Sequence, residues 1–230
     1  SPTMVSLTVE NYVKQIYQIC GEAGGRPAAT GKIAVALSVS PGTVTSMLKT
    51  LSDSHLVSYV PYEGVRLTPA GTVLALRILR RHRLIELFLV NVLGMNWDEV
   101  HDEAENLEHA VSDQLVDLID KFLGYPNVDP HGDPIPKADG SLESPDAQSL
   151  ATCEVGERFR FSRVIDQSPE FLRYLSGSGL GIGTEGEVVA VDYKLTDAGT
   201  VTITVSGEKM TLALGLAAKI LVDKQMSSSA

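Results

Sequence analysis

Apolar and polar positions in the first quarter of the chain follow helical spacing, interrupted by short breaks. Apolar residues recur three and four positions apart over residues 9–20, which predicts an amphipathic helix. The same spacing predicts a second helix over residues 30–37 and a third over residues 41–54, joined by a tight turn. Ser40 suits the N-cap of the third helix, and Pro41 suits its first position.

A hairpin and a longer helical stretch follow. Apolar and polar residues alternate over residues 56–62 and 65–67, on either side of a Glu-Gly pair, which predicts a β-hairpin. Helical spacing then resumes and predicts one long helix over residues 69–93. It continues over residues 97–123, where we expect a break near Ser112.

The last part of the chain has a different pattern. Residues 124–145 contain five prolines, which predicts a loop or linker. Short alternating runs separated by glycines begin near residue 154 and predict a small β-barrel of SH3 type, closed by an apolar segment over residues 210–222. We therefore expect an α+β protein. Its three predicted domains are a winged helix-turn-helix over 1–72, a helical domain with linker over 73–145, and an SH3-like domain over 146–230.

Two helices joined by a tight turn and followed by a hairpin are typical of a winged helix-turn-helix. In that arrangement the second helix of the pair enters the DNA major groove by its N-terminus, and the hairpin touches the flanking backbone. Arg and Asn are missing from this helix, so direct base reading is expected to be modest and DNA shape to contribute. The candidate DNA-binding residues are Ser40, Pro41, Thr43, Thr45, Ser46, Lys49 and Thr50, with Tyr62 and Arg66 on the wing and Arg26 beside it.

The net charge of −10 argues against nucleic acid until its distribution is considered. Residues 1–90 hold nine Lys and Arg against five Asp and Glu, a balance of +4, whereas residues 91–230 have a balance of −14. Such asymmetry suits a phosphate-binding domain joined to a cation-binding one. No apolar run is long enough to cross a bilayer, and two cysteines make a disulfide framework improbable, so we expect a soluble cytoplasmic protein without membrane contact.

Histidine and glutamate recur at ligand spacing on the two central helices. His82 and Glu86 are four residues apart, and His101, Glu105, Glu108 and His109 would share one stripe of the next helix. Imidazole and carboxylate groups together suit Mn²⁺, Fe²⁺, Co²⁺, Ni²⁺ or Zn²⁺. The alternative is a solvated acidic helix face, which the interleaved histidines make less favourable.

At this point the chain resembles the diphtheria toxin repressor family, over nearly its whole length. Members of that family are iron- or manganese-dependent regulators that dimerise and repress metal-uptake genes when metal-loaded. The resemblance rests on the combination of motifs at residues 10–12 (Glu-Asn-Tyr), 40–44 (Ser-Pro-Gly-Thr-Val), 67–71 (Leu-Thr-Pro-Ala-Gly), 81–86 (Arg-His-Arg-Leu-Ile-Glu), 100–104 (Val-His-Asp-Glu-Ala), 108–113 (Glu-His-Ala-Val-Ser-Asp) and 130–136 (Pro-His-Gly-Asp-Pro-Ile-Pro).

The resemblance implies a primary metal site formed by Glu105, Glu108 and His109. A residue of the first helix, usually Met or Asp, completes that site in the family. Asn11 stands at this position here, and the neighbouring Glu10 is the alternative ligand. Because Glu105 replaces the Cys of the iron-sensing branch and a carboxylate is harder than a thiolate, Mn²⁺ is favoured, with Fe²⁺ as the other candidate.

The resemblance also implies an ancillary site and a third-domain contribution to it. His82, Glu86 and His101 match the ancillary ligands, and Gln167 and Glu170 are the expected third-domain contributors. In the streptococcal-type manganese members the Pro-rich linker takes part as well, which adds Asp129 and His131.

The function expected from these features is metal-dependent repression by a homodimer on double-stranded operator DNA, with no enzymatic activity and no organic substrate. Its dimer contact is expected along the apolar positions Leu107, Val111, Leu115, Leu118, Ile119 and Phe122, which could equally be domain core. The alternatives are a metal-independent regulator with an organic effector and a His/Glu metalloenzyme. The sequence contains no helical His-Glu-x-x-His motif, and an enzyme would leave the wing unexplained.

Overall fold

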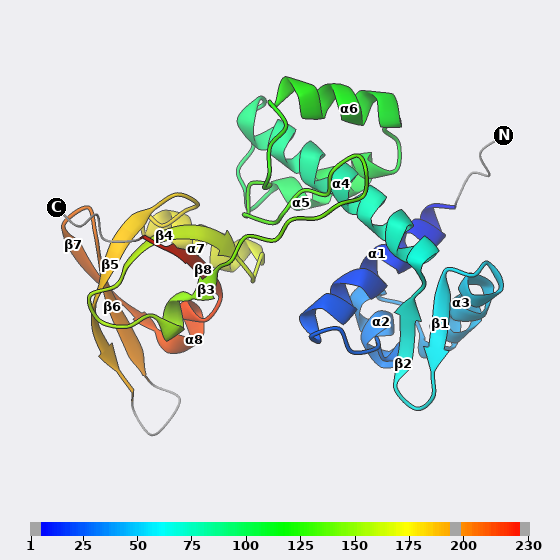
Figure 1. Cartoon of the computed structure of the whole chain (residues 1–230), viewed down its shortest axis with the longest axis horizontal. Coiled ribbons are helices and arrows are strands. Elements are labelled where there is room, and N and C mark those ends of the chain that lie inside the picture. The colour runs from blue at the N-terminus through cyan, green and yellow to red at the C-terminus, as the bar shows by residue number, and fades with distance from the viewer. Residues whose placement is uncertain (1–5, 194–198, 226–230) are drawn as a thin grey trace. The chain divides into compact units, whose positions relative to one another are not determined.

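The computed structural model describes residues 6–193 and 199–225. They form two compact units. The first unit contains the N-terminal domain to His82, together with Glu105–Asp117 and Pro136–Leu142. The second contains Arg83–Ala104, Leu118–Ile135 and the chain from Glu143 onward. Figure 1 shows the elements of both, coloured along the chain.

The N-terminal elements confirm the predicted winged helix-turn-helix. Ser40 caps α3 as expected, because its Oγ accepts a hydrogen bond from the Thr43 amide at 3.1 Å and Pro41 occupies the first turn. Ser38 adopts the left-handed conformation, with φ of 54°, at the end of α2 and so permits the tight turn. The elements are α1 (Leu7–Glu22), α2 (Thr30–Leu37), α3 (Pro41–Asp53), β1 (Val57–Val60), β2 (Gly64–Leu67) and α4 (Pro69–Asn91).

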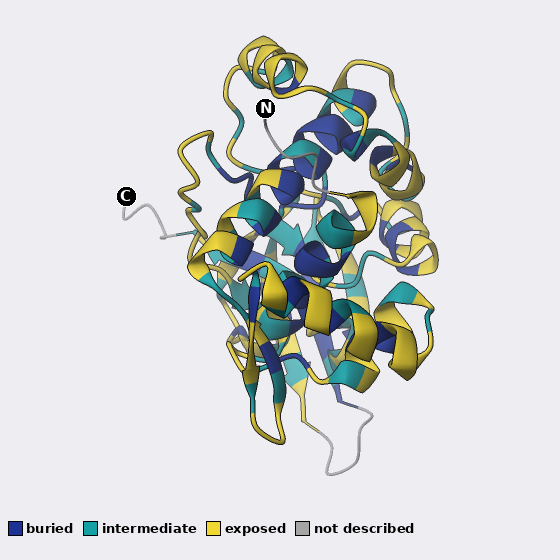
Figure 2. Cartoon of the chain, turned by 90° about the vertical axis from the view of Figure 1, so that its right-hand side faces the viewer, coloured by how far each residue is buried: buried dark blue, intermediate teal, exposed yellow. Residues whose placement is uncertain are grey.

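The core of this unit lies between the three helices and the hairpin. Figure 2 shows the buried positions as dark-blue patches on helices whose other faces are exposed. Ile16, Ile33 and Leu48 are among its fully buried side chains, one from each helix. The hairpin closes on α4 through Gly71, where a Cβ atom would lie 2.1 Å from the Leu56 carbonyl oxygen. Burial of one apolar stripe per helix therefore holds the three helices and the hairpin together.

The central helices break where expected but begin later. α5 (Val100–Glu108) and α6 (Asp113–Phe122) are separated by residues 109–112, which confirms the predicted break near Ser112. The expected start of this helix at Trp97 is wrong. Residues 97–99 form a turn in which the Glu99 amide donates to the Asn96 carbonyl oxygen at 3.1 Å, so helical bonding begins only at Val100.

The C-terminal part is a six-stranded antiparallel sheet in the order β3-β8-β4-β5-β6-β7, as expected for an SH3-like domain. Register shifts between Phe161 and Arg163 and between Val188 and Ala190 mark bulges, which bend strands in small barrels. Its core includes Phe159, Phe161, Val188 and Ile203. The strands are β3 (Gln148–Ser149), β4 (Arg158–Val164), β5 (Glu185–Asp192), β6 (Thr200–Val205), β7 (Glu208–Ala213) and β8 (Ile220–Lys224).

Two features of this domain were not predicted. Helix α7 (Pro169–Gly177) was missed, although Phe171, Leu172 and Leu175 lie on its buried face at helical spacing. The apolar segment at 210–222 is not one element, because the short helix α8 (Leu214–Ala217) separates β7 from β8. Within the described ranges, no helix combines the length and apolarity that a membrane span requires, and both cysteines are free thiols.

Candidate metal centres and nucleic-acid interface

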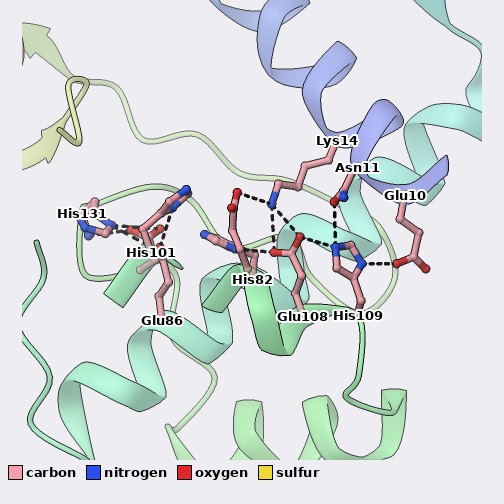
Figure 3. Close-up of polar contacts among 11 residues, drawn as sticks. Glu10, Asn11, Lys14, His82, Glu86, His101, Glu108, His109 and His131 are labelled. Atoms are coloured by element: carbon pink, nitrogen blue, oxygen red, sulfur yellow. Dashed lines mark hydrogen bonds and ion pairs between the residues drawn. The ribbon is translucent and has the colours of Figure 1, made fainter. Parts of the chain in front are cut away.

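Glu108 is the centre of a buried polar cluster in the first unit (Figure 3). Its carboxylate is fully buried at the end of α5 and contacts side chains from α1 and α4. Lys14 donates to both oxygens, at 2.8 and 3.0 Å, and His82 Nδ1 lies 2.5 Å from Oε2. Burial alone would raise the pKa of Glu108, but the hydrogen bond from His82 and the charge of Lys14 outweigh it and lower that pKa.

His109 connects this cluster to α1 through both ring nitrogens. Nε2 lies 3.1 Å from Glu108 Oε1 and 2.9 Å from Asn11 Oδ1, whereas Nδ1 lies 2.5 Å from Glu10 Oε2. Glu108 and Asn11 therefore face the same nitrogen, and Glu10 lies on the opposite side of the ring. A carboxylate on the second nitrogen is the arrangement that orients metal-ligating histidines.

Glu105 lies at the edge of this cluster. Its side chain is 44% exposed and its Oε1 is 3.6 Å from Lys14 Nζ. It precedes Glu108 by three residues on α5, so both carboxylates lie on the side of the helix near Lys14.

A second cluster lies in the other unit and joins α4 to the Pro-rich segment. Glu86, Asp129 and His131 are all buried, and each offers one ligand atom within 4.8 Å of the others. His131 Nδ1 is 3.4 Å from Glu86 Oε2 and 4.0 Å from Asp129 Oδ2. Asp129 Oδ1 accepts the backbone N–H groups of His131 and Asp133 at 2.8 and 2.9 Å, which holds the loop and leaves Oδ2 toward the cluster.

The second cluster carries the electrostatic signature of a cation site. His131 Nε2 lies 2.7 Å from the Trp97 carbonyl oxygen, whereas Nδ1 is buried without a well-aligned hydrogen-bond partner. Burial disfavours the charged ring, but Glu86 and the charge of Asp129 raise the pKa of His131 to about 9. Burial, together with the charges of Asp133 and Glu86, raises the pKa of Asp129 well above its usual value. Two close, buried carboxylates disfavour each other's ionised forms unless a cation neutralises them.

The N-terminal face of α3 is exposed and rich in hydroxyl groups. Every DNA-binding candidate on this helix is exposed, as are Arg26, Tyr62 and Arg66. The Thr45 hydroxyl donates to the Pro41 carbonyl oxygen at 3.0 Å, so it already has a partner within the helix. Tyr62 lies at the tip of the wing with φ of 63°, an uncommon conformation for an aromatic residue.

Comparison with known proteins agrees with this architecture. Residues 4–65 match the model described as iron dependent repressor, N-terminal DNA binding domain, residues 68–137 match the metal binding and dimerisation domain of the same repressors, and residues 148–224 match the FeoA domain. The diphtheria toxin repressor of Corynebacterium efficiens is 31% identical over 94% of this chain and 95% of its own length. The chain belongs to the diphtheria toxin repressor family.

Solved structures of this repressor family are similar over 94% of this chain. A manganese-dependent transcriptional repressor in complex with manganese is 38% identical, covers 94% of this chain and 100% of its own, and has a TM-score of 0.82. ScaR with bound Zn²⁺ is 33% identical, covers 94% of this chain and 99% of its own, and has a TM-score of 0.77. The family to which this chain belongs therefore consists of metal-dependent transcriptional repressors.

Of the remaining residues that the repressor resemblance suggested as ligands, some lie at one of the two clusters and others do not. His101 Nδ1 lies 3.4 Å from Glu86 Oε1, so it borders the second cluster from α5. His82 lies one turn before Glu86 on α4 and contacts Glu108. Gln167 Nε2 donates to Asp133 Oδ2 at 2.7 Å, and Glu170 belongs to none of the His, Cys, Asp and Glu groups found among the described residues, so the ligand roles of both stay predictions.

Two residues of these centres were missed by sequence reasoning. Lys14 is a charged residue on the apolar side of α1, one turn after Glu10, and this position could have signalled a buried partner. The backbone oxygen of Trp97 positions His131, and a main-chain acceptor has no sequence signal.

The donor groups fit a divalent cation. The first cluster offers a carboxylate, an imidazole and an amide oxygen, and the second offers two carboxylates and an imidazole whose Nδ1 faces Glu86 at 3.4 Å. Neither thiol takes part, because Cys20 contacts the Val65 carbonyl oxygen and Cys153 lies in the sheet core. Oxygen and nitrogen donors without sulfur favour Mn²⁺, Fe²⁺ and similar ions.

Proposed function

We propose that this chain is a transcriptional repressor that binds operator DNA as a homodimer when it holds Mn²⁺, with Fe²⁺ as the alternative activator. The observation that carries the proposal is the contact of His109 with Asn11. It joins α1 of the DNA-reading head to the residue that follows α5, through an amide oxygen and an imidazole nitrogen that can both bind a divalent cation.

Glu108, His109 and Asn11 are the proposed ligands of the first centre, with Glu105 able to swing in from the edge of the cluster. A bound divalent cation would supply the positive charge that lets these groups converge. Glu10 would hold the His109 ring through Nδ1, so that Nε2 stays directed at the centre. Glu86, Asp129, His131 and His101 are the proposed ligands of the second centre.

The chain's own residues then suggest how occupancy is transmitted to DNA. Asn11 and Glu10 lie on the first helix of the head, so fixing them to His109 fixes the orientation of that helix. When these groups are not held together, the head samples several orientations and DNA binding must select one of them. A bound cation would also reduce the repulsion between the Glu105 and Glu108 carboxylates.

The proposed DNA contacts follow from the exposed face of α3. Thr43 and Ser46 would meet phosphates near the helix N-terminus, Lys49 would meet a phosphate further along α3, and the Thr45 methyl would approach a thymine methyl. Arg66 and Tyr62 on the wing and Arg26 beside α2 would contact the flanking backbone. Two such heads in a twofold dimer would read half-sites about one helical turn apart. We further propose the three domains over 1–72, 73–145 and 146–230, and a cytoplasmic location.

The test is fluorescence anisotropy with a duplex chosen from a pool of fragments by binding. Wild-type protein is expected to bind with Mn²⁺ or anaerobic Fe²⁺ and to dissociate on addition of EDTA. Glu108→Gln is expected to lose at least tenfold of the metal-activated affinity, whereas Glu103→Gln, which changes an exposed carboxylate of the same helix, is expected to keep it. Equal binding with and without chelator would exclude metal control and favour an organic effector.

A further inference from the structure

Lys14 makes an ion pair that the proposed metal ligation leaves unexplained. Its side chain is only 3% exposed, and its Nζ lies 2.8 and 3.0 Å from the two oxygens of the fully buried Glu108. Glu105 Oε1 is also near, at 3.6 Å. Figure 3 shows the ammonium group of Lys14 pointing at Glu108 from α1.

This pair is not sealed away from the candidate metal centre. Glu108 Oε1 is 2.8 Å from Lys14 Nζ and 3.1 Å from His109 Nε2, so one oxygen is shared by the ammonium group and the imidazole. A structural ion pair serves stability best when both partners are fully satisfied by each other and by fixed donors. Here the Glu108 carboxylate is also a proposed ligand of the metal ion, so Lys14 and the metal ion would bind the same group.

We propose that Lys14 is a tethered cation that competes with the metal ion for Glu108 and thereby sets the metal concentration at which the first centre fills. The proposal rests on the proposed function. The lysine ammonium is a compact charge on a flexible stem, so it can hold Glu108 in the metal-free protein and withdraw when a divalent ion arrives. In this buried setting, repulsion between the two cations is weakly screened.

The competition has a definite thermodynamic consequence. Lys14 stabilises Glu108 in the metal-free state, and part of that interaction is lost on metal binding. The interaction free energy between Lys14 and Glu108 that is lost on metal binding lowers the apparent metal affinity, because metal binding must overcome it. Removal of the Lys14 charge should therefore tighten metal binding, although it removes a native ion pair and destabilises the metal-free protein.

The experiment is isothermal titration calorimetry of the full-length protein with MnCl₂ in the absence of DNA. The binding phase that Glu108→Gln eliminates belongs to the first centre. For that phase, Lys14→Met is expected to lower Kd at least tenfold, and Lys14→Arg, which keeps the charge, is expected to stay within threefold of wild type. Lys32→Met removes the same charge from the exposed surface of α2 and is expected to change nothing.

Thermal melting of the same proteins gives a second readout. Metal-free Lys14→Met is expected to melt at a lower temperature than wild type. Mn²⁺ is expected to raise the melting temperature of Lys14→Met by more than it raises that of wild type. Lys14→Gln serves if Lys14→Met does not fold without Mn²⁺. Equal or weaker Mn²⁺ binding by the neutral variants overturns it. If the wild-type protein shows no Mn²⁺-binding phase that depends on Glu108, the proposed function is overturned. The ratio of the Lys14-variant Kd to the wild-type Kd tests only the role of Lys14.

Discussion

His131 donates a hydrogen bond from Nε2 to the backbone oxygen of Trp97 at 2.7 Å, and this bond decides where its other nitrogen points. Nδ1 is left 3.4 Å from Glu86 Oε2 in a fully buried position. Because a carbonyl oxygen can only accept, Nε2 carries a proton in every protonation state. Nδ1 is therefore the atom that either holds a second proton or binds a metal.

Metal binding at the second centre should release protons. The pKa of His131 is raised to about 9 from 6.5, so the metal-free ring is charged at neutral pH and must lose a proton to become a ligand. Affinity for Mn²⁺ is expected to rise with pH up to about 9. Calorimetry in buffers of different ionisation enthalpy measures the released protons, and His131→Gln should reduce their number. The same number in both proteins would contradict this assignment.

The same pKa shift has the opposite effect on the metal-free fold. A histidine whose pKa is higher in the folded than in the unfolded protein stabilises the fold most at a pH where the ring is protonated in both states. The contribution of His131 is therefore fully present below pH 6.5 and is lost as the pH rises through about 9. Urea denaturation of EDTA-treated protein at pH 6.5 and pH 9 should show falling stability, with a smaller fall for His131→Gln.

Gly132 should tolerate no side chain, because it brings the His131 loop against β4. A Cβ atom there would lie 2.0 Å from the Ser162 carbonyl oxygen, and φ is +84°. Gly132→Ala combines left-handed strain with a backbone clash and is expected to cost about 2–5 kcal/mol. Gly140 has the same φ with no atom within 4 Å of the added Cβ, so Gly140→Ala should cost only about 1–2 kcal/mol. Thermal denaturation compares them, and equal losses would exclude the clash.

Lys49 should contribute to DNA affinity without contributing to sequence choice. It lies exposed on α3, and its charge suits a phosphate contact. Lys49→Ala is expected to weaken binding to all duplexes similarly and to reduce the salt dependence of binding by about one ion per head. Lys209→Ala removes an exposed charge from β7 and serves as the control. A change in preferred sequence would indicate a base contact instead.

The exposed apolar side of α6 should hold the dimer together. Leu118 and Phe122 are 56% and 68% exposed in the single chain, and Leu115 lies beside them on the same helix. Exposed apolar side chains grouped in this way indicate an interface. Leu118→Asp is expected to shift the protein toward monomer in sedimentation velocity, whereas Val35→Asp, a comparable change on α2, should leave the dimer intact. A dimeric Leu118→Asp protein would place the interface elsewhere.

The sequence by itself determined the local structure of this protein. Helical spacing defined α2 to the residue and α3 to within one, and the Ser-Pro start of α3 identified its cap, because such signals depend on neighbours within one turn. Spacing also placed Glu105 and Glu108 on one helix, whereas His109, expected on the same helix, lies one residue beyond its end. The predicted helix start at Trp97 was wrong and α7 was missed, because local preferences are weak in a turn and in a short helix.

Only the tertiary structure decided which of these groups meet. Asn11 and His109 are 98 residues apart, and Lys14 and Glu108 are 94 apart, so no local pattern could pair them. The polar contacts of α1 with the end of α5 give Asn11 the His109 nitrogen that faces Glu108 and give Glu10 the other one. The Asp129 turn likewise brings His131 to Glu86 and directs Gln167 to Asp133. Periodicity depends on the chain's own geometry, whereas these contacts depend on the burial of apolar side chains far apart in sequence.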